Sequence, residues 1–210
     1  MPLKNRVTPW GEIISTSERG LFMGNRGCLH NDQRHVFKAW ARPPWVTCVL
    51  QFRGRHREVM SPGLYTELFF LDEATALAAG HRPCATCRRA DFNTFKDYWL
   101  SANPELVAIT GTSMTKIDKA LHSERVDSSR QKHIWPTILK ELPDATIVVY
   151  EGSRSPLLVW RGGLYTWTPG GYVQRQVLPS DVSVNVLTPP SVVNVLKAGY
   201  QPLVHASALS

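Results

Sequence analysis

The feature that most constrains this chain is a Cys-x-x-Cys pair, Cys84 and Cys87, at the end of a short predicted helix. Asp72 is a typical N-terminal cap for that helix and Gly80 is a typical C-terminal stop, with an alanine-rich stretch between them. Two thiolates at this spacing can occupy two corners of a zinc tetrahedron. Arginines stand on both sides of the pair. The segment therefore predicts a small zinc-binding module that faces a polyanion.

The overall composition is typical of a globular protein with no membrane-spanning segment. Hydrophobic residues make up 43% and charged residues 20% of the 210 residues. No apolar run approaches the roughly 20 residues that a membrane span needs, and the N-terminal residues lack the apolar core of a signal peptide. We therefore expect a cytoplasmic, monomeric protein whose four cysteines are reduced.

The positive charge is concentrated in the first quarter of the chain. The net charge is +7, and residues 1–57 contain ten Lys or Arg against three Asp or Glu, which accounts for all of it. Such a bias favours a face that binds a polyanion. Arg53, Arg55 and Arg57 alternate within it and predict several cations on one side of a strand end. The alternative for these three arginines is a solvated hairpin tip.

The pattern along the chain predicts an α+β protein. Stretches rich in β-branched and aromatic residues predict strands at 45–53, 64–70, 145–150, 156–160, 171–177 and 182–187. Apolar residues at three- and four-residue steps predict helices at 72–80, 87–102, 113–142 with a break near 126–133, and 190–198. We expect a zinc-bearing half with short strands and helices, residues 1–102. It packs as one compact unit on a helical connection and a β-rich half, residues 103–210.

The region around the cysteines carries further features in a fixed order. A pair of phenylalanines precedes the short helix, an Ala-Gly stop ends it, and an Arg-Pro pair stands directly before the first cysteine. These residues are Phe69, Phe70, Ala79, Gly80, Arg82, Pro83, Cys84 and Cys87. In these features residues 69–88, a tenth of the chain, resemble the zinc-binding N-terminal domain of the Ada DNA-repair proteins. His81 stands where that family usually has an aromatic residue. The resemblance implies a bound zinc ion and contact with DNA.

The resemblance also bears on the remaining zinc ligands. In the Ada family these are two upstream cysteines four residues apart, one of which accepts a methyl group from DNA, and no such pair is present here. We therefore do not expect methyl transfer. Some Ada-like domains attached to nucleases use a histidine after a Gly-Asn-basic stretch, which is similar to residues 24–30. The implied ligands are His30, Cys48, Cys84 and Cys87, with Cys28 as the substitute for His30.

Glu67 is the first candidate for a catalytic carboxylate. By strand alternation it shares a face with Phe69, and Tyr65 is its neighbour on that side. Burying a carboxylate among aromatic residues is unfavourable unless the group is paired or functional. Burial would raise its pKa toward the range of a general base. The alternative is a structural ion pair with Arg55 or Arg57.

Asp127 is the second candidate. It lies in a polar stretch, residues 122–133, that is dense in acids, bases and cations. If this stretch is functional, Asp127 would lie near the reaction centre while Arg130, Lys132 and His133 hold phosphates. The alternative is a solvated connection between helices.

Aromatic residues are the candidates for holding a base outside the DNA stack. Seven tryptophans are many for this length. Residues 165–172 are the segment we select for a pocket wall or lid, and we predict a base pocket from Tyr65, Trp167 and Tyr172. The alternative for these aromatic residues is packing in the core.

Together these features predict a zinc-containing, DNA-binding protein that acts on damaged or modified DNA. Our leading hypothesis is a DNA glycosylase in which Glu67 or Asp127 assists departure of the base. The alternatives are a non-enzymatic reader of modified DNA and a nuclease. DNA repair and defence against phage are both compatible settings. The predicted DNA-contacting residues are Arg26, Arg53, Arg55, Arg57, Arg82, Arg88, Arg89, Arg130 and Lys132.

Overall fold

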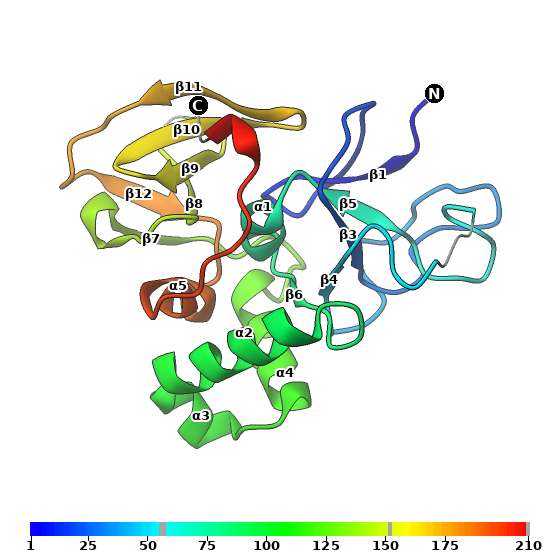
Figure 1. Cartoon of the computed structure of the whole chain (residues 1–210), viewed down its shortest axis with the longest axis horizontal. Helices are drawn as coiled ribbons and strands as arrows, with labels where there is room; N and C mark the ends of the chain where they lie inside the picture. Colours follow the sequence, from blue (N-terminus) through cyan, green and yellow to red (C-terminus); the bar gives the residue numbers. More distant parts are fainter. Residues whose placement is uncertain (55–57, 151–152, 209–210) are drawn as a thin grey trace.

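The computed structural model describes residues 1–54, 58–150 and 153–208. It has two six-stranded sheets, with helices between and beside them, which confirms the predicted α+β class (Figure 1). The first sheet has the strand order β2-β1-β5-β3-β4-β6, and the second has the order β11-β10-β9-β8-β12-β7. The described helices include none that is both long and apolar enough to cross a lipid bilayer.

The first sheet is built from short strands in the N-terminal part of the chain. They are β1 (Lys4–Val7), β2 (Ile13–Ser15), β3 (Phe22–Asn25), β4 (Val46–Cys48), β5 (Leu68–Phe70) and β6 (Arg82–Pro83). The pairs β1–β5 and β4–β6 are parallel and the other pairs are antiparallel. The strands predicted at 45–53 and 64–70 are present but shorter. Backbone at Arg53 and Met60 has a positive φ (52° and 58°), which interrupts extended structure between β4 and β5.

The second sheet is antiparallel throughout and comes from the C-terminal part. Its strands are β7 (Trp135–Ile138), β8 (Ile147–Val149), β9 (Leu157–Trp160), β10 (Gly163–Thr168), β11 (Gly171–Gln176) and β12 (Ser183–Val186). The helix predicted over 113–142 is wrong for residues 135–138, which form the edge strand β7. Pro136 is tolerated there because an edge strand needs fewer backbone donors. The segment 165–172, which the sequence indicated as a pocket wall or lid, covers the end of β10 and the start of β11.

The helices are mostly where the apolar spacing predicted them. They are α1 (Glu73–Ala78), α2 (Arg89–Ala102), α3 (Pro104–Thr110), α4 (Met114–Arg125) and α5 (Pro190–Lys197), with 3₁₀ turns η1 (Leu139–Glu141) and η2 (Ala206–Ala208). Asp72 caps α1 by accepting a hydrogen bond from the Thr75 backbone N–H at 2.8 Å. Gly80 follows α1 with a φ of 84°. Helix α4 ends at Arg125 because the backbone of Val126 is extended.

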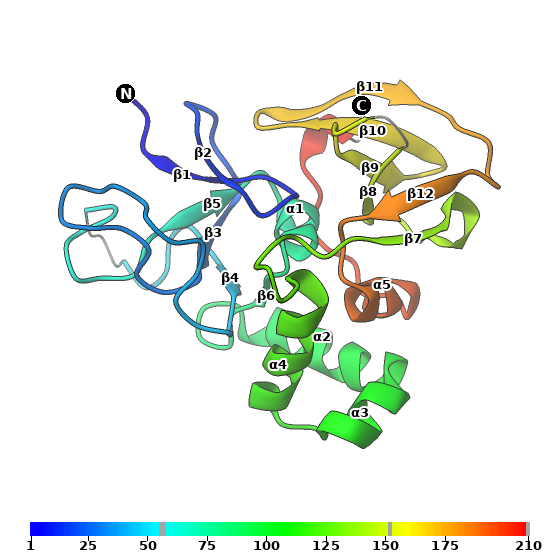
Figure 2. The same cartoon turned by 180° about the vertical axis from the view of Figure 1, so that it is seen from behind.

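Helix α1 lies at the centre of the molecule, between the two sheets (Figures 1 and 2). All of its residues are buried. Ala74, Leu77 and Ala78 belong to the larger hydrophobic cluster, whereas Ala76 and Ala79 belong to the cluster under the first sheet. Small side chains let both layers approach the same short helix. The larger cluster includes residues from 71 to 208, so the halves 1–102 and 103–210 share one core.

Two residues predicted for the base pocket are part of this core. The Trp167 Nε1 donates to Thr75 Oγ1 at 3.0 Å, and the Tyr172 hydroxyl donates to Asp72 Oδ2 at 2.9 Å. Both side chains are at most 9% exposed. Burial raises the pKa of Asp72 and raises that of Tyr172 well above its ordinary value. Trp167 and Tyr172 therefore anchor the second sheet to α1, and their prediction as pocket walls is corrected.

Candidate metal centre and basic pocket

Three cysteines meet at the end of the first sheet. Strand β4 ends at Cys48 and pairs in parallel with β6, whose next residue is Cys84. The Cys84 backbone N–H donates to the Thr47 carbonyl at 2.9 Å and extends this pairing. Cys87 follows in the turn before α2. The sulfur atoms of Cys48, Cys84 and Cys87 all lie within 4.8 Å of one another, so three of the four predicted ligands come together.

The three thiols also bias one another electrostatically. Hydrogen bonds from the neighbouring thiols lower the pKa of Cys84, and the same contact with Cys84 raises the pKa of Cys48. The Thr86 backbone N–H points at the Cys84 sulfur from 3.4 Å and further favours a thiolate there. A thiolate is the form that binds a metal ion. The set therefore fits a soft, thiolate-preferring metal ion.

The predicted fourth ligand is not part of this group. His30 is buried, with Nδ1 2.6 Å from Thr66 Oγ1 and Nε2 3.3 Å from the Ser61 carbonyl. Its substitute Cys28 places its sulfur 3.6 Å from the His30 carbonyl. Across the described ranges, neither residue belongs to the group that could hold a metal. The implied roles of His30 and Cys28 are corrected, because local bonds to the loop before β5 hold the histidine elsewhere.

Two of the predicted DNA-contacting arginines form buried ion pairs instead. Arg82 forms a two-pronged pair with Asp118 of α4, at 2.9 and 2.7 Å. Arg88 pairs with Glu73 of α1 at 2.8 Å and with Asp91 at 2.7 Å. Because their guanidinium groups are buried and paired, Arg82 and Arg88 brace the helices around the cysteine group and are not placed for the predicted contact with DNA.

The other predicted arginines differ in their surroundings. Arg89 is exposed at the start of α2, and exposed Arg53 lies 5.1 Å from the ring centroid of Phe52. Both remain available to a polyanion. Arg55 and Arg57 lie outside the described residues.

The two predicted catalytic carboxylates occupy unlike positions. Glu67 is 4% exposed, and its Oε2 accepts a hydrogen bond from the Met60 backbone N–H at 2.8 Å. Asp127 is exposed and accepts from the Gln131 backbone N–H at 2.9 Å, which closes the turn after α4. Tyr65 is half-buried beside Glu67 in the chain. None of these residues lines the basic pocket described next.

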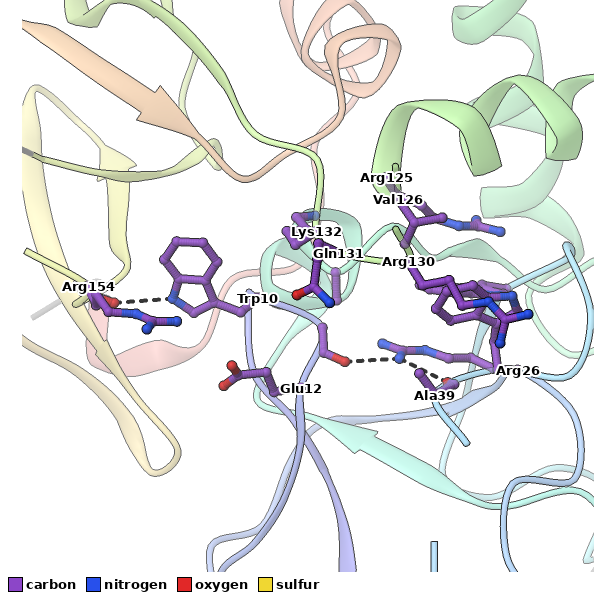
Figure 3. Close-up of a pocket in the computed structure, with 14 residues that line it drawn as sticks. Trp10, Glu12, Arg26, Ala39, Arg125, Val126, Arg130, Gln131, Lys132 and Arg154 are labelled. Atoms are coloured by element: carbon purple, nitrogen blue, oxygen red, sulfur yellow. Dashed lines mark hydrogen bonds between the residues drawn. The ribbon is translucent and has the colours of Figure 1, made fainter. Parts of the chain in front are cut away.

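This pocket is a cavity of about 280 Å³ between the two sheets and the end of α4 (Figure 3). That volume is near the lower end of the roughly 300–1,000 Å³ of ligand pockets. Five separate segments of the chain, together with the end of α1, contribute its walls. The lining residues are Trp10, Gly11, Glu12, Arg26, Ala39, Trp40, Trp45, Ala79, Arg125, Val126, Arg130, Gln131, Lys132 and Arg154. Glu12 is the carboxylate among them.

Two arginines in the pocket are held rigidly. Arg26 donates from Nε to His81 Nε2 at 3.1 Å and from Nη1 to the Gly11 carbonyl at 3.0 Å. Arg125 donates from Nη1 to the Gly80 carbonyl at 2.8 Å. A Cβ at Gly80 would lie 2.5 Å from Arg125 Cδ, so this glycine serves both the turn and the close approach of the arginine. Such anchoring fixes the guanidinium groups before any ligand arrives.

A lysine completes the cationic wall. The Lys132 ammonium donates to the Ala78 carbonyl, at the end of α1. Burial, together with the charges of Arg26 and Arg125, lowers the pKa of Lys132 to about 7. Burial and the same arginines lower the pKa of His81 well below its ordinary value, so this imidazole is neutral and can accept the bond from Arg26.

Only part of this site is predictable from the sequence. Arg26, Arg130 and Lys132 were predicted to contact DNA, and all three line the pocket. Arg125 and Glu12 were missed because neither belongs to a recognisable motif. The available signal was the placement of tryptophans in loops, and Trp10, Trp40 and Trp45 are indeed lining residues.

Comparison of the chain with models of known protein families, with curated proteins and with solved structures gave no match. The geometry of the thiol cluster and of the pocket is therefore the basis for assigning a function.

Proposed function

We propose that this protein is a zinc-containing, DNA-binding protein that acts on damaged or modified DNA, as a DNA glycosylase that excises a modified base. The observation that carries the proposal is the pocket, which combines cations, half-buried tryptophans and a carboxylate in one cavity. A glycosylase must hold the backbone, accept an extruded base and assist cleavage of the bond to the sugar. The pocket offers a group for each task.

Trp10 and Trp40 are suited to hold the base. Both are only partly buried, and both line the cavity. Trp40 packs edge-on to His122 with ring centroids 5.6 Å apart, and the Trp10 indole N–H donates to the Arg154 carbonyl at 3.1 Å. Aromatic faces held in this way can stack on an extruded base. In the view of Figure 3, Trp10 and Arg26 lie on opposite sides of the cavity.

Glu12 is the carboxylate best placed to act on the sugar. It lines the cavity, whereas Glu67 is buried against the Met60 backbone. In the proposed reaction, water adds to C1′ of the sugar and the bond from C1′ to the base breaks. The carboxylate of Glu12 accepts a proton from the water, and the base leaves with the bonding electron pair and is then protonated. A carboxylate also stabilises the cationic sugar as this bond breaks. Asp127, in the loop between Val126 and Arg130, is the second candidate.

We assign zinc to the cysteine group and give it a structural task. Thiolates are preferred ligands of zinc, and a structural zinc site stabilises a loop-rich region outright. Cys48, Cys84 and Cys87 would hold the ion between β4, β6 and the start of α2. None of them lines the basic pocket. The metal would thus fix the first sheet, while exposed Arg53 and Arg89 remain free to extend the contact with the DNA backbone.

Excision is tested by incubating the protein with duplexes that carry a panel of modified bases, followed by alkali. Breaks that require alkali indicate a glycosylase, and we expect Glu12→Gln to reduce them at least 100-fold while duplex binding is retained. Glu67→Gln is the matched control, because it changes a carboxylate outside the cavity. If the wild type excises a base and both Glu12→Gln and Asp127→Asn still excise it equally well, the catalytic assignment is wrong.

The second candidate is a reader of modified DNA that lacks catalysis. The exposure of Glu12 favours it, because a solvated carboxylate is a weaker base than a desolvated one. A reader would retain modified duplexes and produce no breaks with or without alkali. A nuclease would break the DNA directly. It is less favoured, because the metal-binding group of the described residues is the cysteine cluster, away from the pocket lining.

A further inference from the structure

The inner wall of the basic pocket has an unbalanced charge. Arg26 and Arg125 are each 1% exposed. Burial and then the charge of Arg26 lower the pKa of Arg125, and burial with both arginine charges lowers the pKa of Lys132. Among the ion pairs of the described chain, none includes Arg26, Arg125 or Lys132. The nearby Asp118 is already neutralised by its two-pronged contact with Arg82. Buried charges that are not balanced by an opposite charge are strongly unfavourable, so this arrangement favours binding of an anion.

The hydrogen-bonding capacity of the same wall is also incomplete. Arg26 Nη2 and Arg125 Nε are buried and, in the part of the chain that the structure describes, neither has a hydrogen-bond partner. The other nitrogens of Arg26 donate to the Gly11 carbonyl and to His81. Those of Arg125 bond to the Gly80 and Pro43 carbonyls and to His122. Buried donors are paired in nearly all native structures. A ligand with several acceptor oxygens would use both of these donors.

The neighbouring groups determine what kind of anion fits. Trp45 lies directly beside both guanidinium groups, and half-buried Trp40 packs against it with ring centroids 5.7 Å apart. Arg130 lies over Trp40, 5.9 Å from its ring centroid, at the outer side of the cavity. A ligand that fills the cavity therefore has an anionic end at the buried cations and an aromatic part near the tryptophans.

We propose that Arg26, Arg125 and Lys132 form a specific binding site for the phosphate group of a nucleotide, whose base lies against the pocket tryptophans. Guanidinium groups suit phosphate because their fixed donors match its oxygens, and an ammonium adds a point charge. The site takes the phosphate either of a free nucleotide or of a nucleotide within a strand. This deepens the proposed function, but it does not depend on base excision.

The binding test compares thymidine 5′-monophosphate with thymidine at pH 6.5, followed by tryptophan fluorescence and calorimetry. We expect the nucleotide to bind at least tenfold more tightly than the nucleoside, and inorganic phosphate to compete with it. Lys132→Gln should weaken nucleotide binding about tenfold or more, in line with the loss of a charge-assisted contact. Lys197→Gln makes the same substitution at an exposed lysine of α5, outside the pocket, and should leave binding unchanged. Arg26→Gln is interpreted only if its thermal unfolding remains cooperative.

A single-stranded oligothymidylate distinguishes the two sources of the phosphate. Tighter binding of the oligonucleotide than of the mononucleotide, with the same loss in Lys132→Gln, assigns the site to a nucleic-acid strand. Equal binding assigns it to a free nucleotide and supports the phosphate site. Equal affinity for nucleotide and nucleoside, or an equal loss in Lys132→Gln and Lys197→Gln, would overturn the inference. The alkali assay fails or succeeds separately, so the two proposals are distinguishable.

Discussion

Arg26 and Arg125 come from separate elements of the fold and meet at one indole ring: their guanidinium carbons lie 4.1 and 3.9 Å from the ring centroid of Trp45. Arg26 follows β3, whereas Arg125 is the last residue of α4. The negative face of an indole attracts a cation, and this offsets part of the repulsion between the two arginines. Trp45 therefore links the first sheet to helix α4 at the wall of the cavity.

Replacing Trp45 tests this link. Trp45→Leu removes the aromatic face and leaves space beside two buried charges, so we expect the free energy of unfolding to fall by about 3 kcal/mol or more. Nucleotide affinity should fall as well. Trp45→Phe keeps an aromatic ring and should lose less of both. Urea unfolding and fluorescence titration measure the two effects. If both substitutions have the same effect, the aromatic character of the side chain is not what matters.

The cysteine group predicts about one zinc ion per chain. Cys84→Ser should abolish zinc binding, as measured by elemental analysis of the purified protein, and should lower the melting temperature. Cys28→Ser is the matched control, because Cys28 lies outside the group and its loss should leave the zinc content unchanged. A wild-type protein that contains no metal after purification without chelators would contradict the zinc assignment.

The buried pair of Arg82 and Asp118 predicts a large effect on stability. Removing one partner of a buried pair leaves the other charge uncompensated, so we expect Asp118→Asn to lower the free energy of unfolding by about 3–5 kcal/mol. The exposed pair of Arg34 and Glu58 is the control, and Arg34→Ala should change stability by less than about 1 kcal/mol. Chemical denaturation of both variants measures the difference. Equal effects would show that Arg82 is not held by the aspartate.

Lys132 predicts the pH dependence of anion binding. Its pKa is about 7 in the free protein, so the ammonium is progressively lost as the pH rises above 7. A thymidine dinucleoside phosphodiester keeps a constant charge over this range. Its affinity should therefore fall between pH 7 and 8.5, by at most about tenfold per pH unit. His81 and His122 have lowered pKa values and are already neutral at pH 7.

The other charged groups at the cavity do not share this transition. Burial lowers the pKa values of Arg26 and Arg125 as well, but a delocalised guanidinium keeps its proton in this pH range. Lys132→Gln should consequently show a flat affinity profile from pH 6.5 to 8.5. A variant whose profile falls as steeply as that of the wild type would assign the transition to another group.

Gly80 predicts a coupling between the turn after α1 and the pocket. Gly80→Ala adds a methyl group 2.5 Å from Arg125 Cδ at a backbone φ of 84°, so it should reduce both stability and nucleotide affinity. Gly63→Ala is the control, because φ is 71° there but no atom lies within 4 Å of the added Cβ. The control should lose only the roughly 1–2 kcal/mol of a left-handed alanine, with affinity unchanged. Comparable loss of affinity in both variants would contradict the coupling.

Local signals in the sequence predicted the elements around α1 well. Asp72 and Gly80 delimit the helix because capping and chain reversal depend on neighbouring residues alone. The same holds for the Cys84 and Cys87 pair, whose spacing fixes its geometry. Predictions that relied on a distant partner were less successful. Nothing near Arg82 or Arg88 in the chain indicates that Asp118 and Glu73 neutralise them in the fold.

The sequence by itself thus determined the α+β class, the capped helix α1 and the chemistry of a thiol group. Periodicity and turn residues report which face of an element is apolar and where the element ends. They do not report which elements meet. Only the tertiary structure placed Trp167 and Tyr172 in the core, and only it brought Arg26, Arg125 and Lys132 to one cavity. Charges from distant segments meet there because both sheets pack against α1. That packing depends on side chains from the whole length of the chain.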